Sequence, residues 1–285
     1  MRIRLNFNST GQELLIEGRR KLSASGIENA GREAKILLFF ALDCNFTNTE
    51  ILLNLVKCPD KIRKFFIILE ERINCKPIAK IIGKKMFYND EFIVNEHVLY
   101  PRPETETLVS TALENDFSSV LDLGTGSGCI VISLLKKNSN AHGLGTDISR
   151  KALKIAKKNA CALGVSRRLV FMESNWFSQV KSKFDLIVSN PPYISSKEFP
   201  DLNNEVVMYE PKIALLGGKD GLEVFKILIN AAHKFLNPRG RFIVEVGFSQ
   251  GKYVKELFYK AGFIDVKLVK DLELKDRVVM GSLPT

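Results

Sequence analysis

Apolar residues in the first quarter of the chain recur at helical spacing. Segments 34–41 and 62–69 place them at intervals of three and four residues, which is the period of an amphipathic helix. Asn48 and Asp60 are suitable helix caps. The pattern predicts a small domain of short helices over residues 1–75.

Strand-like stretches follow this helical region. Residues 85–88 and 91–94 flank Asn89-Asp90, a dipeptide that is typical of tight turns. We therefore expect a β-hairpin within a linker over residues 76–100, and a larger domain over residues 101–285.

Strand and helix patterns alternate through the rest of the chain. Such alternation predicts an α/β fold, with a doubly wound, mostly parallel sheet covered by helices on both faces. The last two strands follow one another closely, so they should form an antiparallel hairpin at one edge. The predicted strands cover 120–123, 143–147, 169–172, 184–189, 241–246, 266–269 and 277–280, with helices from Cys129 and over 149–163.

The composition, with 45% hydrophobic and 26% charged residues, is that of an ordinary globular protein. The longest apolar runs, 36–42 and 65–69, are far shorter than the roughly 20 residues of a membrane span, and Met1–Arg4 are not followed by a signal-peptide core. Five scattered cysteines without a CxxC pair, and three histidines, favour neither zinc nor disulfides. We expect a cytoplasmic protein without metal or membrane partners.

The formal charge of +10 is compatible with a polyanionic partner such as RNA. The excess is spread out, because residues 1–100 hold 16 Lys+Arg against 12 Asp+Glu and the remainder holds 26 against 20. The lysines of segment 151–158 have the spacing of a solvated helix face. We therefore expect no stable nucleic-acid partner.

A glycine loop, Gly124-Thr125-Gly126-Ser127-Gly128, follows the first strand of the predicted sheet. Doubly wound folds bind nucleotides at this position, where glycines allow close approach and free N–H groups face the ligand. A dinucleotide loop would need glycine or alanine at Cys129. Asp147 ends the second strand, where a carboxylate can accept hydrogen bonds from both ribose hydroxyls. The pattern predicts an adenosine ligand without pyrophosphate; a purely structural turn is the alternative.

The third predicted strand ends before Glu173-Ser174-Asn175-Trp176, which we expect to lie over the adenine. Either Trp176, the only tryptophan, or Phe177 would offer an apolar surface there. A core-filling position for Trp176 is the alternative interpretation.

The turn Asn190-Pro191-Pro192-Tyr193 follows the fourth predicted strand. Its prolines fix the backbone and remove two N–H groups, so the carbonyls and the Asn190 side chain form a rigid set of acceptors. Such acceptors can aim an amide or aromatic amine nitrogen at a sulfonium methyl group and stabilise the charge that develops on it, while Tyr193 lies against the planar group. The pattern favours nitrogen methylation; an ordinary proline turn is the alternative.

Further short motifs are spread over nearly the whole chain. They are Lys76-Pro77-Ile78-Ala79 with Ile82-Gly83, Pro101-Arg102-Pro103-Glu104-Thr105-Glu106, Tyr209-Glu210-Pro211 with Ala214-Leu215, Gly217-Gly218-Lys219-Asp220-Gly221-Leu222 and Asp276-Arg277-Val278-Val279. With the glycine loop and the Asn190 turn, they resemble the peptide-chain release factor glutamine methyltransferases, a family of class I methyltransferases. The Asn-Pro-Pro-Tyr turn alone is shared with adenine and guanine methyltransferases.

This resemblance implies a seven-stranded Rossmann-like sheet, S-adenosyl-L-methionine as cofactor, and methylation of N5 of the glutamine in the Gly-Gly-Gln motif of class 1 release factors. It also implies that the helical domain grips this protein substrate. It assigns cofactor binding to Gly124, Thr125, Gly126, Ser127, Gly128, Asp147, Trp176 and Asn190, substrate binding to Asn190, Pro191, Pro192 and Tyr193, and catalysis to Asn190, Pro191 and Tyr193.

The chain departs from the family pattern at two positions. Asn175 stands where an aspartate usually precedes the tryptophan, so a contact to the adenine amino group would be neutral. Tyr100 replaces an aliphatic residue before Pro101, which we expect to be harmless.

Two other functions are open at this point. A nucleic-acid amino methyltransferase, acting on adenine N6 or guanine N2, would suit the basic charge, but residues 1–100 lack an obvious basic and aromatic surface. A non-catalytic adaptor that binds a translation factor would keep the fold, and measurable cofactor binding would argue against it. We expect a monomeric enzyme.

Overall fold

The computed structural model describes residues 9–45 and 49–285. It divides into two compact units, Met1–Gly83 and Lys84–Thr285. The predicted cap Asn48 and the start Met1–Arg4 lie outside the described residues.

The smaller unit is helical, as expected. Its elements are α1 (Gly11–Ala24), α2 (Ala30–Leu42), the 3-10 helix η1 (Thr49–Leu52), α3 (Pro59–Ile73) and α4 (Ile78–Ile82). The apolar positions of the helical pattern form its core, in which Leu37, Phe65 and Leu69 are fully buried. Asp60 lies in the first turn of α3, after Pro59, and Cys58 takes the cap position instead.

The hairpin expected in the linker belongs to the larger unit. It consists of β1 (Lys84–Phe87) and β2 (Asp90–Ile93), paired antiparallel. Phe87 and Phe92 are almost fully buried in the core of the larger unit. The expected linker over residues 76–100 is therefore divided, since α4 groups with the helical unit.

A seven-stranded sheet in the order β5-β4-β3-β6-β7-β9-β8 organises the larger unit. The first five strands in this order are parallel, and β9 and β8 form the expected antiparallel pair at the edge. The strands are β3 (Ser119–Leu123), β4 (His142–Asp147), β5 (Leu169–Glu173), β6 (Phe184–Ser189), β7 (Leu236–Glu245), β8 (Ile264–Lys270) and β9 (Asp276–Ser282).

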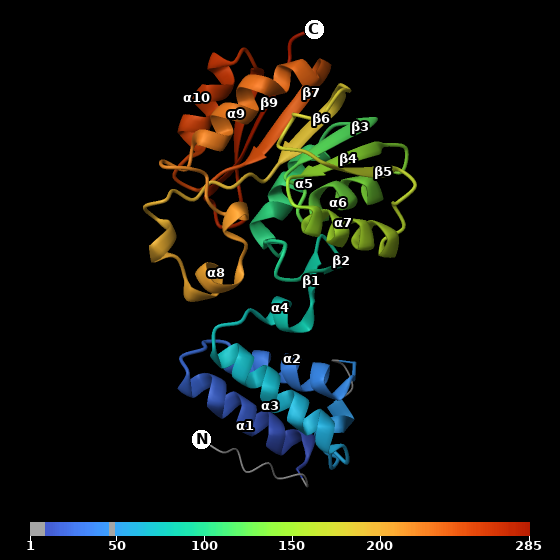
Figure 1. The fold of residues 1–285 in the computed structure, drawn as a ribbon, viewed down its shortest axis with the longest axis vertical. Coiled ribbons are helices and arrows are strands. Elements are labelled where there is room, and N and C mark those ends of the chain that lie inside the picture. The colour runs from blue at the N-terminus through green and yellow to red at the C-terminus, as the bar shows by residue number, and fades with distance from the viewer. Residues whose placement is uncertain (1–8, 46–48) are drawn as a thin grey trace. The chain divides into compact units, whose positions relative to one another are not determined.

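Helices cover both faces of this sheet, with α5, α6 and α7 on one face and α9 and α10 on the other (Figure 1). Their bounds are α5 (Glu106–Ala112), α6 (Cys129–Lys137), α7 (Arg150–Ala162), α8 (Asn204–Tyr209), α9 (Glu223–Ala232) and α10 (Gly251–Lys260). Short 3-10 helices are η2 (Pro103–Thr105), η3 (Phe199–Asp201), η4 (Lys212–Ala214) and η5 (His233–Phe235).

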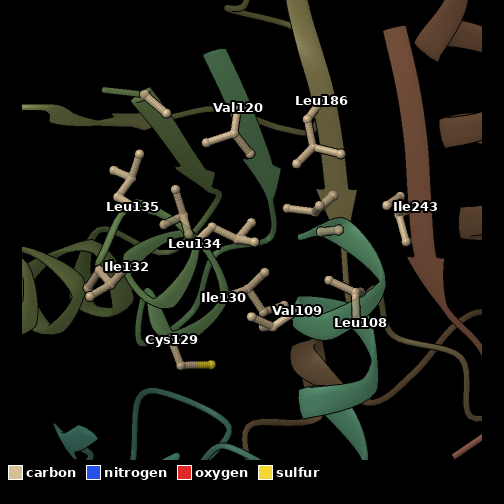
Figure 2. Packing of buried hydrophobic residues seen from close by; sticks show 14 of the residues in the cluster. Leu108, Val109, Val120, Cys129, Ile130, Ile132, Leu134, Leu135, Leu186 and Ile243 are labelled. Carbon is tan, nitrogen blue, oxygen red and sulfur yellow. The ribbon is translucent and has the colours of Figure 1, made fainter. Parts of the chain in front are cut away.

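Successive residues of the central strands point to opposite faces, and both faces are buried, as in other parallel sheets. Val120 of β3 and Leu186 of β6 pack with α5 and α6, together with Ile243 of β7 (Figure 2). Leu121 and Ile187, one residue further along, pack with α9 and α10. The predicted doubly wound fold is confirmed.

The strand order brings the candidate site residues together at the carboxyl ends of the central parallel strands. β3 lies between β4 and β6, and all three strands are parallel. The loops that leave their carboxyl ends therefore converge at the point where the winding direction changes, where open α/β sheets bind ligands. In the part of the chain that the structure describes, no helix has the length and apolarity of a membrane span.

Candidate active site

The glycine loop turns sharply from β3 into α6. Gly124, Gly126 and Gly128 have positive φ angles of +71°, +55° and +82°, which side chains with a Cβ rarely adopt. Between them, the Thr125 amide donates to the Thr146 carbonyl at 2.8 Å, and the Thr125 hydroxyl donates to Oδ2 of buried Asp122 at 2.7 Å. The loop is thus fixed by its own contacts to β3 and β4.

Asp147, at the end of β4, is bound to the same loop. Its Oδ2 accepts a hydrogen bond from the Gly126 amide at 2.9 Å, and its Oδ1 accepts one from the Ser149 amide at 2.8 Å. Burial raises the pKa of Asp147 from its ordinary value, against the effect of these two hydrogen bonds. The carboxylate is therefore oriented by the backbone and keeps further lone pairs for a ligand.

Asn159 of α7 is a supporting residue that the sequence analysis did not identify. It is fully buried, and its Nδ2 donates to the Ser127 carbonyl at 2.8 Å. Its Oδ1 accepts from the Ile93 amide at 2.8 Å, so the side chain joins the glycine loop to the hairpin. A single buried asparagine in a basic helix gives no sequence signal for this role.

A cavity of about 280 Å³ lies beside these residues. Its lining includes most of the predicted cofactor-binding residues: Gly124, Thr125, Gly126, Ser127, Asp147, Trp176 and Asn190. Gly128 is not part of the lining. A Cβ at Gly128 would lie 2.9 Å from Ile132 Cδ1 and 3.3 Å from Ala156 Cβ, so its glycine allows α6 and α7 to pack closely.

The two aromatic candidates after β5 have different positions. The Trp176 ring lines the cavity with Asn175 and packs beside Gly124, where a Cβ would lie 3.3 Å from the ring. Phe177 is buried in the core and stacks on Phe235, with ring centroids 4.5 Å apart. Of the pair, only Trp176 provides an apolar wall to the cavity.

The Asn190 turn starts directly after β6. Asn190 and Pro192 line the large cavity, whereas Pro191 is buried and absent from its lining. Asn190 Nδ2 donates to the hydroxyl of Thr105 at 3.2 Å, across 85 residues of sequence. This contact directs the amide nitrogen of Asn190 toward Thr105 and leaves Oδ1 as the acceptor for a ligand.

The segment around Gly217 and Gly221, one of the motifs that resemble the family, packs against the backbone of the Asn190 turn. A Cβ on Gly217 would lie 2.5 Å from the Pro192 carbonyl oxygen, and a Cβ on Gly221 would lie 2.4 Å from that of Tyr193. Gln250 Nε2 donates to the carbonyls of Tyr193 and Gly221 at 2.9 and 3.3 Å. Only glycine permits so close an approach of two backbone segments.

A second cavity, of about 260 Å³, shares Leu99, Arg102, Asn190 and Ala214 with the first. Tyr193 and Glu245 also line it, and the Tyr193 hydroxyl donates to Glu245 Oε1 at 3.3 Å. Glu245 ends β7, the strand beside β6, and is 1% exposed. Asn190 therefore lies between two cavities, one beside the glycine loop and one beside a buried acid.

Arg102 connects two further family motifs beside this second cavity. Its guanidinium lies 3.6 Å from Oε1 of the buried Glu210. It also stacks over the Tyr100 ring, 4.0 Å from the ring centroid, and donates to the Tyr100 hydroxyl. Tyr100 therefore supports Arg102, although its departure from the family pattern had suggested no particular role.

Two buried carboxyl groups at this edge of the sheet have raised pKa values. Burial raises the pKa of Asp122 to about 7, although the Thr125 hydrogen bond acts in the opposite direction. Burial likewise raises the pKa of Glu245 to about 7, although Thr105 and Arg277 act to lower it. Such values are typical of functional sites, where charged groups are held away from water.

Comparisons with known proteins agree with this architecture. The family model of the methyltransferase small domain matches residues 103–219, and that of the PrmC N-terminal domain matches residues 13–83. The methyltransferase from Pyrococcus furiosus superposes with a TM-score of 0.55 at 20% identity, over 77% of this chain and 99% of that one. At this identity the likeness shows the fold alone.

Curated relatives match nearly the whole chain. The release factor glutamine methyltransferase of Cereibacter sphaeroides is 40% identical over 264 residues, which cover 93% of this chain and 95% of that protein. The bifunctional methyltransferase of Rickettsia bellii is also 40% identical and covers 95% of this chain, which corresponds to 54% of the longer relative.

Proposed function

We propose that this chain, which belongs to the release factor glutamine methyltransferase family, methylates the side-chain amide nitrogen N5 of the glutamine in the Gly-Gly-Gln motif of class 1 release factors. The observation that carries the proposal is the position of Asn190, which lies between the two cavities with its Oδ1 available as an acceptor. A release factor acts in translation, so we expect the reaction in the cytoplasm.

The large cavity has the features that S-adenosyl-L-methionine requires. The backbone-oriented Asp147 carboxylate suits two ribose hydroxyls, and Trp176 offers an apolar wall for the adenine. Gly124 and Gly126 line this cavity without a side chain, so a ligand could approach the backbone closely at these two positions. When bound, the cofactor supplies an electrophilic methyl group on a positively charged sulfur.

The residues of the turn would prepare the glutamine for this transfer. Asn190 Oδ1 and the carbonyl that precedes Pro192 would accept the two hydrogens of the target amide and point its nitrogen toward the large cavity. As the nitrogen acquires positive charge, the same acceptors stabilise it without having to reorient. Because they grip N–H groups, they would select an amide over a hydroxyl nucleophile.

The substrate is assigned through the relatives. Proteins named release factor glutamine methyltransferase match 92–93% of the chain, and the PrmC N-terminal model matches residues 13–83 of the helical unit. We infer that the helical unit contacts the release factor. The alternative of a nucleic-acid amino methyltransferase has no such support.

The proposal is tested by incubating the protein with S-adenosylmethionine labelled on its methyl group. Purified release factor, ribosomes and tRNA are offered separately, and the label is mapped by mass spectrometry. We expect label on the Gly-Gly-Gln glutamine of the release factor. Label on RNA alone, or on a different residue type, would refute the proposal.

The variant Asn190→Ala tests the catalytic assignment in the same assay. Loss of one preorganised acceptor should lower single-turnover rates by about a hundredfold or more at saturating cofactor. The affinity for release factor should hardly change, because most of its contact surface lies elsewhere. Near-normal turnover in a folded variant would contradict the assignment.

A further inference from the structure

The second cavity contains a buried carboxyl group with an unused acceptor atom. Glu245, at the end of β7, lines this cavity and is 1% exposed. Its Oε1 accepts a hydrogen bond from the Tyr193 hydroxyl at 3.3 Å. Its Oε2 is buried and has no hydrogen-bond partner among the residues that the structure describes. Because a buried polar atom without a partner costs free energy, its retention beside a cavity points to a ligand that supplies the partner.

Glu245 lies on the same side of the sheet as Asn190. In the parallel pair of β6 and β7, Val188 is opposite Ile243, and both pack in the core with α5 and α6. Asn190 and Glu245 follow these two residues at a distance of two positions in the chain. Since side chains alternate between the faces of a strand, both belong to this side, and both line the second cavity. A substrate held by Asn190 therefore lies within reach of Glu245.

The two arginines that line this cavity are paired with other acids. Arg277 Nε lies 3.0 Å from Oδ2 of the buried Asp271, and the Arg102 guanidinium lies 3.6 Å from Glu210. The donor for Glu245 Oε2 is then expected from a bound molecule. A carboxylate can only accept hydrogen bonds, so this molecule has to present an N–H or O–H group.

In the proposed substrate, backbone amides are the donors that lie next to the target side chain. The two hydrogens of the glutamine side-chain amide would be held by Asn190 Oδ1 and the carbonyl that precedes Pro192. The two residues before this glutamine are glycines, whose only donor is the backbone N–H. Without side chains, this part of the loop can bring its backbone close to a buried carboxylate.

We propose that Glu245 Oε2 accepts a hydrogen bond from a backbone N–H of the substrate loop, either that of the target glutamine or that of the glycine before it. Glu245 then fixes the backbone of the substrate, while Asn190 and the proline turn fix its side chain. Two such anchors limit the orientations of the target nitrogen, which favours the reactive geometry. This inference rests on the proposed function, because it concerns the substrate that is assigned there.

The variant Glu245→Met tests the contact with intact release factor. Methionine is flexible and of similar length, but its sulfur is only a weak acceptor. At pH 8.5 the wild-type carboxyl group, with a pKa of about 7, is ionised. Loss of a hydrogen bond to a charged group should lower kcat/KM for release factor by about tenfold or more, with cofactor affinity unchanged. The control Glu256→Gln removes an exposed charge on α10 and should change kcat/KM by less than about twofold.

A backbone ester in a Gly-Gly-Gln peptide tests the same contact from the side of the substrate. The ester replaces one N–H by an oxygen, so it removes a donor and nearly keeps the shape of the chain. For the wild-type protein, an ester at the glutamine or at the glycine before it should lower kcat/KM by about tenfold or more. In Glu245→Met the same ester should change kcat/KM by less than about twofold, because the acceptor is already missing. An ester at the end of the peptide serves as the control.

The variant Tyr193→Phe separates a direct contact of Glu245 from an indirect one. It removes the hydroxyl that donates to Oε1 and leaves Oε2 in place. The difference between amide and ester peptides should therefore persist in this variant, even where its overall turnover is lower. If Tyr193→Phe abolished this difference, Glu245 would act by orienting Tyr193, and the inference would be wrong.

The outcomes separate this inference from the proposed function. If the wild-type protein does not modify release factor, the proposed function fails. If it does, and Glu245→Met retains the wild-type kcat/KM or responds to the esters as the wild type does, the inference fails and the proposed function stands. Denaturant titration verifies the fold of Glu245→Met. This variant should be at least as stable as the wild type, since it removes a buried charge, whereas a purely structural role for Glu245 predicts a loss of stability.

Discussion

Preorganisation is visible at single residues of the site. Asp147 accepts hydrogen bonds from two backbone amides, so its carboxylate is oriented before any ligand arrives. Asn190 is oriented in the same way through Thr105. Groups that are fixed in advance lose little freedom on binding, which favours affinity and rate.

Asp147→Ala should weaken cofactor binding by about tenfold or more, because charge-assisted hydrogen bonds contribute roughly 1.5–3 kcal/mol. Titration calorimetry measures the effect. Asp185→Ala is a matched control, since Asp185 also accepts from two backbone amides, those of Ser118 and Ser119, but belongs to the start of β6. Equal cofactor affinity of the Asp147 variant and the wild type would refute the assignment.

The raised pKa of Glu245 predicts a cost in stability. Its folded-state pKa of about 7 exceeds the ordinary value of 4.5, so the folded state favours the protonated carboxyl group. The stabilising contribution of this group to the free energy of unfolding is therefore complete below pH 4.5 and is lost as the pH rises through 7. Above pH 8 the charged form should cost about 3 kcal/mol, from 1.36 kcal/mol per pKa unit.

Glu245→Gln should therefore raise the free energy of unfolding at pH 8.5 by up to about 3 kcal/mol, with little gain at pH 5. Denaturant titrations at the two pH values check this difference. A variant that is no more stable than the wild type at pH 8.5 would show that Glu245 is less strongly perturbed than its burial indicates.

The sequence predicted the residues whose chemistry is local. Gly124, Asp147 and Asn190 could be placed because each lies at the carboxyl end of a predicted strand or directly after it. Thr105 could not be assigned its role, since its partner is 85 residues away. Glu245 lies inside the predicted strand 241–246, and nothing in the sequence pattern indicates that its charged side chain is buried.

At the scale of elements, the loop after β6 depends on a second loop for its shape. The prolines restrict the backbone of the Asn190 turn, and Gln250 with the Gly217–Gly221 segment closes around it. The sequence identified this segment as a family motif without a physical role. The close approaches at Gly217 and Gly221 indicate its physical role, because they bring the backbone of this segment against the carbonyl groups of Pro192 and Tyr193.

Two glycines with nearly equal φ angles allow a test of this role. Gly221 has a φ of +74° and Gly164 a φ of +75°, but a Cβ on Gly164 would meet no atom within 4 Å. Alanine at Gly164 should cost only the strain of the left-handed backbone, about 1 kcal/mol. Alanine at Gly221 should in addition displace Tyr193 and lower kcat by about tenfold or more.

Methyl-transfer assays and denaturant titrations of Gly221→Ala and Gly164→Ala compare the two positions. Cofactor affinity should persist in both, since Asp147 and the glycine loop are untouched. If both variants lost activity equally, backbone strain alone would explain the effect. The packing of the Gly217–Gly221 segment against the Tyr193 backbone would then be unimportant for activity.

On the scale of the whole molecule, each unit has its own hydrophobic core. The helical unit buries Leu37, Phe65 and Leu69, and the larger unit contains both cavities and the complete sheet. The sequence predicted two domains but ended the first at residue 75. The boundary follows Gly83 instead, because α4 packs with the helices and the hairpin buries Phe87 in the larger core.

This division predicts separable functions. A fragment of residues 84–285 should fold, since it retains its core, and should bind S-adenosylmethionine with an affinity close to that of the full chain. It should methylate intact release factor much more slowly, by about a hundredfold in kcat/KM, because the contacts that we assign to the helical unit are lost.

A short peptide containing Gly-Gly-Gln, which is too small to need those contacts, should be modified at similar rates by the fragment and the full chain. Calorimetry, circular dichroism and transfer of labelled methyl groups to both substrates provide the measurements. Equal efficiency of fragment and full chain on the intact release factor would show that the helical unit has another purpose, whereas loss of activity on the peptide as well would mean that it supports the active site itself.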